Sequence, residues 1–124
     1  MDANLKGKTV LVVDDEPDLR ELMVSEFEFF EANVLEAQNG EEAFEIVKNE
    51  KVDVVVSDIL MPGGSGLDLL DKLKSQLGTF PPVFFITGFA EISAEDAIKR
   101  GAKNVFSKPF NWDEMIAEVA KSIN

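Results

Sequence analysis

Short runs of β-branched and other apolar residues recur along this 124-residue chain. Four of these runs predict strands, because each is four to six residues long and rich in Val, Ile or Phe. They lie at residues 9–13, 52–57, 83–86 and 104–107. A weaker fifth run, residues 33–36, is centred on Val34 and Leu35. The pattern therefore predicts five strands spread over the whole chain.

The segments between these runs carry apolar residues at helical spacing, which predicts five helices with one buried face each. The predicted faces are Leu19, Leu22, Met23, Phe27 and Phe30; Ala43, Phe44, Ile46 and Val47; Leu67, Leu70, Leu73 and Leu77; Ala94, Ala97 and Ile98; and Met115, Ile116, Val119, Ala120 and Ile123. Apolar strands that alternate with helices are typical of a parallel sheet covered on both faces. Since no flexible linker interrupts the pattern, we expect one α/β domain over residues 1–124.

The composition removes several kinds of chemistry. The chain has no Cys and no His. This excludes disulfides, zinc sites built on Cys or His, and catalytic triads that depend on His. Any chemistry must come from carboxylates, hydroxyls and lysine.

The charge is strongly acidic and unevenly placed. The chain has 24 acidic and 12 basic residues, and residues 14–50 hold 13 of the acids against only Arg20 and Lys48. Such a surface repels phosphate backbones and anionic lipids, so we expect no direct binding to nucleic acid or membrane. No apolar run is long enough for a signal peptide or a membrane span, and we expect a cytoplasmic location.

Polar residues follow each of the four strong strands. In chain order they are Asp14 with Asp15, Asp58, Thr87 and Lys108. Taken singly, each has an ordinary explanation as a helix cap, a turn residue or a surface charge. In a parallel sheet, however, all of them arrive at the carboxyl edge, where open α/β sheets bind their ligands. Their joint occurrence therefore predicts one site.

Three carboxylates at one edge repel one another, and proteins keep such groups together mainly around a hard cation. An all-oxygen ligand set favours Mg²⁺, which typically leaves a position for a phosphate oxygen. Lys108 and the Thr87 hydroxyl suit a phosphoryl group in transfer. Because aspartate can itself attack phosphorus, the predicted reaction is phosphoryl transfer to an aspartate.

Four segments together resemble the signature segments of the response-regulator receiver domain of two-component signalling: VLVVDDEPDLR, VVVSDILMPGGSGLDLL, FFITGFA and FSKPF. The resemblance covers essentially the whole chain. It implies a flavodoxin-like, doubly wound fold whose five parallel strands lie in the order 2-1-3-4-5, with five helices. It also implies a single-domain regulator similar to the chemotaxis regulators.

The resemblance also implies a role for each site residue. The implied metal ligands are Asp14, Asp15, Asp58 and the backbone carbonyl of Leu60. Asp58 would be the phosphoacceptor, Thr87 the switch hydroxyl and Lys108 the lysine that pairs with phosphate. The family further implies a cis bond between Lys108 and Pro109.

The sequence departs from the family pattern at two positions. Ser65 stands where the family commonly has an acid, which we expect to loosen the turn after Asp58. Val105 stands where the family usually has the aromatic half of its switch, and Phe106 is the neighbour of that position rather than its equivalent. In addition, the apolar Leu60 and Phe89 stand at positions that influence water access, which predicts slow loss of the phosphoryl group.

The implied function is a phosphorelay switch. A sensor histidine kinase or a histidine phosphotransferase would donate to Asp58 and dock on the acidic first helix, and a downstream protein would bind the surface formed by residues 91–124. We expect no enzymatic action beyond the chain's own phosphorylation and dephosphorylation. We also expect no attached output module, and a monomer that dimerises at most on phosphorylation.

Two alternatives stay open at this stage. A haloacid-dehalogenase-like phosphatase would also form an aspartyl phosphate, but it needs a second Asp where this chain has Leu60. A binding module that works without phosphorylation is the other alternative, although such modules are expected to have lost the phosphoacceptor or the lysine.

Overall fold

The computed structural model describes residues 4–59, 61, 65–88 and 94–124. Its centre is one five-stranded parallel sheet in the order β2-β1-β3-β4-β5, which confirms the predicted fold class and strand order. The strands are β1 (Thr9–Val13), β2 (Asn33–Ala37), β3 (Val54–Asp58), β4 (Val83–Thr87) and β5 (Asn104–Ser107). The helices are α1 (Pro17–Phe29), α2 (Gly40–Asn49), α3 (Gly66–Leu77), α4 (Ala94–Lys99) and α5 (Trp112–Ile123).

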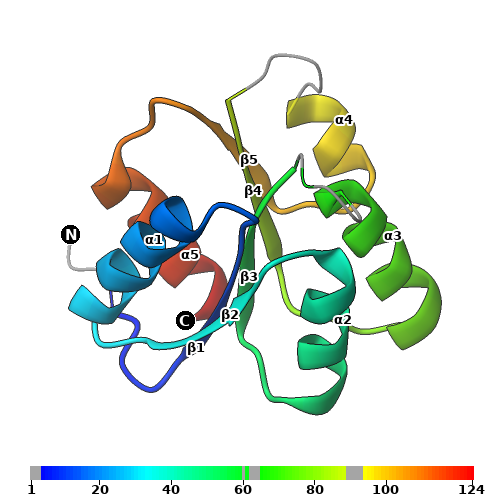
Figure 1. Cartoon of the computed structure of the whole chain (residues 1–124), viewed down its shortest axis with the longest axis horizontal. Coiled ribbons are helices and arrows are strands. Elements are labelled where there is room, and N and C mark those ends of the chain that lie inside the picture. The colour runs from blue at the N-terminus through cyan, green and yellow to red at the C-terminus, as the bar shows by residue number, and fades with distance from the viewer. Residues whose placement is uncertain (1–3, 60, 62–64, 89–93) are drawn as a thin grey trace.

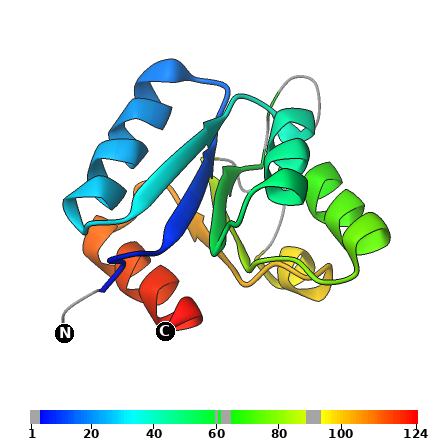
Figure 2. The same ribbon diagram turned by 90° about the horizontal axis from the view of Figure 1, so that it is seen from below.

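The helices cover both faces of the sheet. Helices α1 and α5 lie on one face and α2, α3 and α4 on the other, as Figures 1 and 2 show. Side chains of one strand alternate between these faces. Val10 and Val12 thus belong to the core under α1 and α5, and Leu11 and Val13 to the core under α2, α3 and α4. The central strands are apolar throughout because both of their faces are buried.

Two residues predicted to face the core do not. Leu22 on α1 and Ile98 on α4 are each 46% exposed. The buried residues of α1, Met23 and Phe27, are about one helical turn apart, and Leu22 is turned away by about 100° from Met23 and about 140° from Phe27. A local apolar pattern therefore overestimated the width of the buried face.

The start of β3 also differs from the prediction. The strand begins at Val54 rather than Val52, because Asp53 forms hydrogen bonds with Thr9, the first residue of β1. The backbone N–H of Thr9 donates to Asp53 Oδ2 at 2.8 Å, and the N–H of Asp53 donates to the Thr9 carbonyl at 2.9 Å. The other end extends one residue further than predicted and includes Asp58.

Val105 and Phe106 are neighbours on β5 and pack on opposite faces of the sheet. Val105 packs against the core under α2, α3 and α4, and Phe106 packs against the opposite core. Phe106 joins a row of rings: it stacks on Phe84 at 6.0 Å between centroids and lies 6.5 Å from Phe110, which meets Trp112 edge-on at 4.8 Å. Phe106 is therefore a partly buried residue packed against the core of the other face, and it does not replace Val105.

Within the described residues, no helix combines the length and apolar character needed to cross a bilayer.

Candidate functional site

Asp14 leaves β1 at the carboxyl edge of the sheet and is almost fully buried, at 1% exposure. Its backbone N–H donates to the carbonyl of Ala37 at 3.1 Å, which continues the pairing with β2. Its side-chain Oδ1 accepts the N–H of Glu16 at 2.8 Å. Glu16 is the N-cap residue of α1, but its side chain does not cap the helix. The Asp14 carboxylate instead accepts a backbone N–H just before the helix begins.

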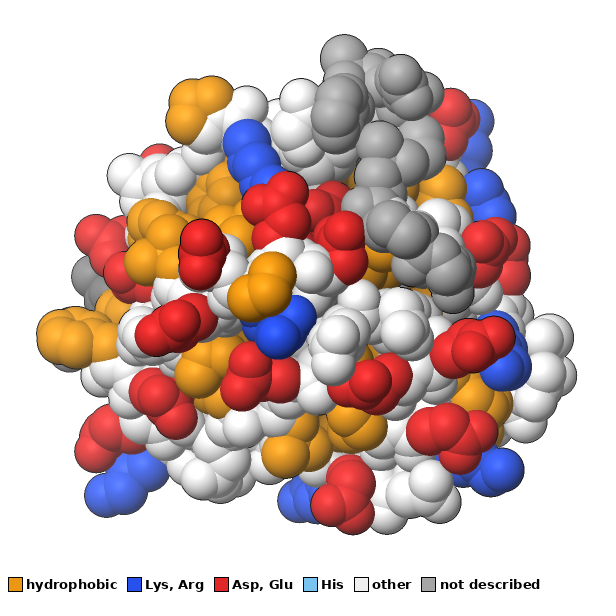
Figure 3. Space-filling model, in the orientation of Figure 1, with side chains coloured by type: hydrophobic (Ala, Val, Ile, Leu, Met, Phe, Trp, Pro, Cys, Tyr) orange, Lys and Arg blue, Asp and Glu red, His pale blue; other side chains and the backbone are white. Residues whose placement is uncertain are grey.

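Asp58 is the last residue of β3 and lies beside the end of β1. Carboxylate oxygens of Asp14, Asp15 and Asp58 all lie within 4.8 Å of one another. We call these three residues the acid cluster. The Nζ atom of Lys108 lies 3.9 Å from Asp58 Oδ2 and brings one positive charge to the cluster. Figure 3 shows acidic side chains gathered beside a basic one where the ribbons of β1 and β3 end in Figure 1.

The end of β3 is tightly packed against the start of α3. A Cβ atom on Gly66 would lie 2.6 Å from the Asp58 carbonyl oxygen and 2.7 Å from the ring of Phe85. Only glycine allows the backbone to come this close to Asp58 and Phe85, because a Cβ atom would overlap both of them. The Gly66 N–H also donates to the carbonyl of Ile59 at 2.8 Å, which ties the first turn of α3 to the end of β3.

Ser65 is the N-cap residue of α3, while most of the turn that it was expected to loosen lies outside the described residues. Its hydroxyl accepts the N–H of Asp68 at 3.1 Å, and the Asp68 carboxylate accepts the N–H of Ser65 at 3.3 Å. This reciprocal pair is a capping box. A serine at this position thus fixes the beginning of α3.

Thr87 and Lys108 follow neighbouring strands and are held together by the backbone. Thr87 ends β4 and is buried, and the Lys108 N–H donates to its carbonyl at 2.8 Å. The bond between Lys108 and Pro109 is cis, as the resemblance implied. The two remaining predicted positions, Leu60 and Phe89, lie outside the described residues.

The electrostatics of the cluster oppose the charged state of its buried member. Burial raises the pKa of Asp14 above its ordinary value of 3.8, and the negative charge of Asp58 raises it further. The hydrogen bond from Glu16 and the charge of Lys108 act in the opposite direction but do not cancel the rise. A hard divalent cation held by these oxygens would relieve the repulsion, so the donor set fits Mg²⁺.

Sequence reasoning missed Arg20, which touches this site. Its Nη1 donates to the Asp14 carbonyl at 2.8 Å, and its Nε donates to Glu36 Oε1 at 3.1 Å. The one available signal was that Arg20 and Lys48 are the sole bases in the acidic stretch of residues 14–50. The contact with Glu36 depends on β2 lying beside β1, which a local pattern does not reveal.

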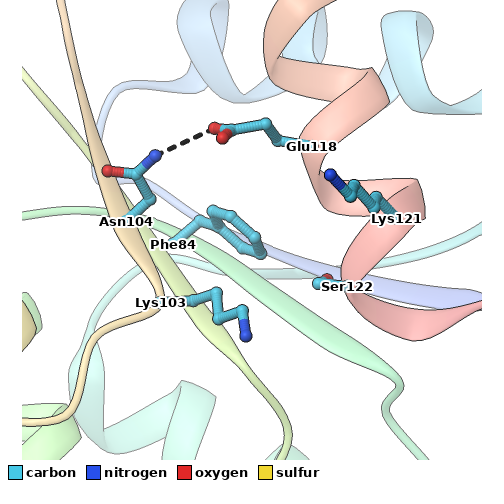
Figure 4. A pocket seen from close by; sticks show the side chains of 6 residues that line it. All are labelled: Phe84, Lys103, Asn104, Glu118, Lys121 and Ser122. Atoms are coloured by element: carbon cyan, nitrogen blue, oxygen red, sulfur yellow. Dashed lines mark hydrogen bonds between the residues drawn. The ribbon is translucent and has the colours of Figure 1, made fainter.

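A surface pocket of about 290 Å³ lies elsewhere, between β5 and α5. Its lining residues are Phe84, Lys103, Asn104, Glu118, Lys121 and Ser122. In Figure 4 the side chain of Asn104 donates to Glu118, at 2.9 Å, across this pocket. Asn104 begins β5, whereas the acid cluster lies at the carboxyl ends of β1 and β3, so the pocket is not part of the candidate site.

Residues 10–120 match the response regulator receiver domain profile. Curated relatives include the phosphate regulon transcriptional regulatory protein PhoB of Pseudomonas aeruginosa, 32% identical over 115 residues, and the probable transcriptional regulatory protein TcrX of Mycobacterium tuberculosis, 37% identical over 111 residues. These matches cover 91% and 87% of this chain, but only 50% and 46% of the relatives. The chain thus spans about half the length of these regulators.

Solved structures agree with this match. The receiver domain of a Francisella response regulator superposes with a TM-score of 0.87 at 28% identity, covering 94% of this chain and 97% of that one. The response regulator TrrA of Thermotoga maritima, in complex with Mg²⁺ and beryllium fluoride, gives 0.82 at 32% identity, covering 92% and 97%. With the sheet order, these matches lead to one conclusion: the chain belongs to the response regulator receiver family of two-component systems.

Proposed function

We propose that this chain accepts a phosphoryl group on Asp58 from a phosphohistidine of a sensor kinase or a histidine phosphotransferase, and that this changes a protein-binding surface. The observation that carries the proposal is the acid cluster with Lys108 beside it, at the edge where receiver domains and other open α/β folds bind ligands. The phosphatase alternative is set aside, since the family is that of receivers.

Asp58 is the member of the cluster suited to be the nucleophile. It ends β3 and its side chain keeps 17% exposure, whereas Asp14 is buried and bonded to the backbone. In the proposed transfer a carboxylate oxygen of Asp58 forms a bond to phosphorus while the bond from phosphorus to the donor's imidazole nitrogen breaks. The imidazole leaves with the electron pair and takes up a proton.

The other site residues hold charge rather than react. Asp14, Asp15 and Asp58 would hold Mg²⁺, which supplies positive charge to the phosphoryl oxygens. The Lys108 ammonium, 3.9 Å from Asp58, would turn to the new phosphoryl oxygens. Thr87 would follow, because its carbonyl is hydrogen-bonded to the N–H of Lys108. This coupling is how the modification would reach β5 and α5.

Named complexes of similar proteins support both the metal and the partner. TrrA was solved with Mg²⁺ and beryllium fluoride, and a CheY of Borrelia burgdorferi was solved with CheX, BeF3 and Mg²⁺. The latter superposes on this chain with a TM-score of 0.84 at 26% identity. We extend these properties to this chain as part of the proposal: Mg²⁺ as the cation, and a protein partner that recognises the modified surface within residues 91–124.

The test of the phosphoacceptor is the intact mass after incubation with acetyl phosphate and Mg²⁺. The native chain should gain one phosphoryl unit, and Asp58→Asn should gain none. Asp71→Asn is a matched control, because Asp71 is an exposed aspartate on α3. Equal labelling of Asp58→Asn and the native chain would remove Asp58 from its role. A native chain that takes up no phosphate would favour the phosphorylation-independent binding module.

The test of the coupling is Lys108→Ala. This variant should still gain a phosphoryl unit, because the nucleophile and the acid cluster are intact. Its backbone amide NMR signals over residues 104–124 should then shift much less than those of the native chain. A full native response in the variant would show that Lys108 does not carry the signal.

A further inference from the structure

We propose that Arg20 is a positioning residue of the acid cluster, which fixes the peptide between Asp14 and Asp15 so that Asp15 faces Asp58. This inference deepens the proposed function, on which its metal-binding test rests. Arg20 lies in the first turns of α1, and its side chain is only 16% exposed. Its guanidinium donates in two directions at once, to the Asp14 carbonyl at 2.8 Å and to Glu36 at 3.1 Å.

The direction of the Asp15 side chain depends on the backbone that precedes it. Within the described part of the chain, the Asp15 carboxylate has no hydrogen bond or salt bridge of its own. Asp14, in contrast, is held at three points: its N–H on Ala37, its carboxylate on Glu16 and its carbonyl on Arg20. The carbonyl belongs to the peptide that joins Asp14 to Asp15. Arg20 is therefore the contact that sets the direction in which Asp15 leaves the strand.

Glu36 keeps the guanidinium in place. It lies in β2 opposite Val12 of β1, two residues before Asp14, and it pairs with Arg20 from there. The planar guanidinium has donors on both sides, so one residue can hold β2 and the Asp14 carbonyl together. A lysine has a single ammonium on a flexible stem and lacks this geometry.

A simple charge effect predicts the opposite result, which makes the proposal testable. Arg20 carries a positive charge near a cation site, so its removal should strengthen Mg²⁺ binding if Arg20 acts through charge alone. If Arg20 positions Asp15, its removal should weaken binding despite the more favourable charge. Outer residues that orient metal ligands typically change metal affinity about tenfold or more.

The experiment is calorimetric titration of the full chain with MgCl₂. We expect Arg20→Gln to raise the Kd for Mg²⁺ about tenfold. Lys48→Gln is the matched control, because it removes one exposed positive charge from the same acidic stretch, and it should leave the Kd within about twofold or lower it. An Arg20→Gln variant that binds Mg²⁺ as tightly as the native chain, or more tightly, would overturn the proposal.

Two further variants separate positioning from folding and from charge. Arg20→Lys should not restore the native Kd, and restoration to the native value would overturn the role of the guanidinium. If circular dichroism shows that the Arg20 variants are unfolded, Glu36→Gln replaces them: it leaves Arg20 in place, should raise the Kd about threefold, and contradicts the proposal if the Kd is unchanged.

Asp15→Asn distinguishes this proposal from the proposed function. If Asp15→Asn binds Mg²⁺ like the native chain, the acid cluster is not the metal site and both proposals fail. If Asp15→Asn loses binding while Arg20→Gln keeps it, only the positioning role of Arg20 fails.

Discussion

The interior of strand β1 and its carboxyl end are buried to the same degree but have opposite energetic effects. Val10 to Val13 are fully buried, and the next residue, Asp14, is 1% exposed. Burial of these four apolar side chains stabilises the fold because apolar surface leaves water. Burial of the carboxylate opposes folding, since it raises the pKa of Asp14 and places it beside the charge of Asp58. The interior of the strand thus stabilises the protein, whereas the carboxylate that follows it opposes folding.

The comparison predicts that a change in the core has the largest effect. Phe85 is fully buried behind Gly66, and Phe85→Ala should lower the free energy of unfolding by about 3–5 kcal/mol. Urea unfolding without metal measures this. Phe29→Ala is the control, because Phe29 is 79% exposed and its loss should change stability by less than about 0.5 kcal/mol. Equal losses in the two variants would contradict the description of the core.

Bound Mg²⁺ should offset the destabilising repulsion between the carboxylates at the carboxyl end of β1. A ligand that binds only the folded chain, at a concentration a hundred times its Kd, adds about 2.7 kcal/mol to the free energy of unfolding. Asp15→Asn should lose most of this gain, whereas Asp18→Asn, an exposed neighbour in the first turn of α1, should keep it. Thermal unfolding with and without MgCl₂ gives the values. A cation effect that survives in Asp15→Asn would place the metal elsewhere.

Removal of the buried charge should stabilise the metal-free protein. In Asp14→Asn the side-chain oxygen can still accept the N–H of Glu16, but the charge is lost. Since the pKa of Asp14 is raised on folding, the native chain loses stability as the pH rises from 3.8 through the folded pKa. Asp14→Asn should therefore match the native chain below that window and exceed it above, by less than the magnesium effect. Urea unfolding across this pH range tests it, and a variant less stable at neutral pH would contradict the sign.

The cap of α3 should have the smallest effect. Ser65→Ala removes one half of the capping box and should lower the free energy of unfolding by about 1 kcal/mol. Ser75→Ala, a change on the same helix where the hydroxyl only meets the Lys72 carbonyl, should cost nothing measurable. The outcome that would contradict the cap is a pair of variants with equal stability in urea.

The fold was predictable from the sequence because its signals are local. Apolar runs marked all five strands, and β1 and β5 have the predicted bounds. The strand order was not derivable in this way and came from the family resemblance, because it depends on contacts between distant segments. The bounds of β3 were missed for the same reason, since Asp53 is held by Thr9, 44 residues away.

The candidate site was predictable only in part. That Asp14, Asp15 and Asp58 come together followed from the rule that parallel strands end at one edge, and the structure places their oxygens within 4.8 Å. The contact between Lys108 and Asp58 followed likewise. Arg20 was missed because its two contacts are set by the angle of α1 and by the neighbour strand β2. The capping role of Ser65 has a local signal, the serine followed three residues later by Asp68, which the comparison with the family pattern did not use.

The row of rings that runs from Phe84 through Phe106 and Phe110 to Trp112 has an optical consequence. The chain has one Trp and no Tyr, so its near-ultraviolet emission comes from a single indole. That indole begins α5 and rests edge-on against Phe110, two residues after Lys108. A displacement of the Lys108 segment changes the packing and polarity around the indole. The wavelength of its emission therefore reports on the segment that links the carboxyl edge to α5, in the unlabelled protein and in real time.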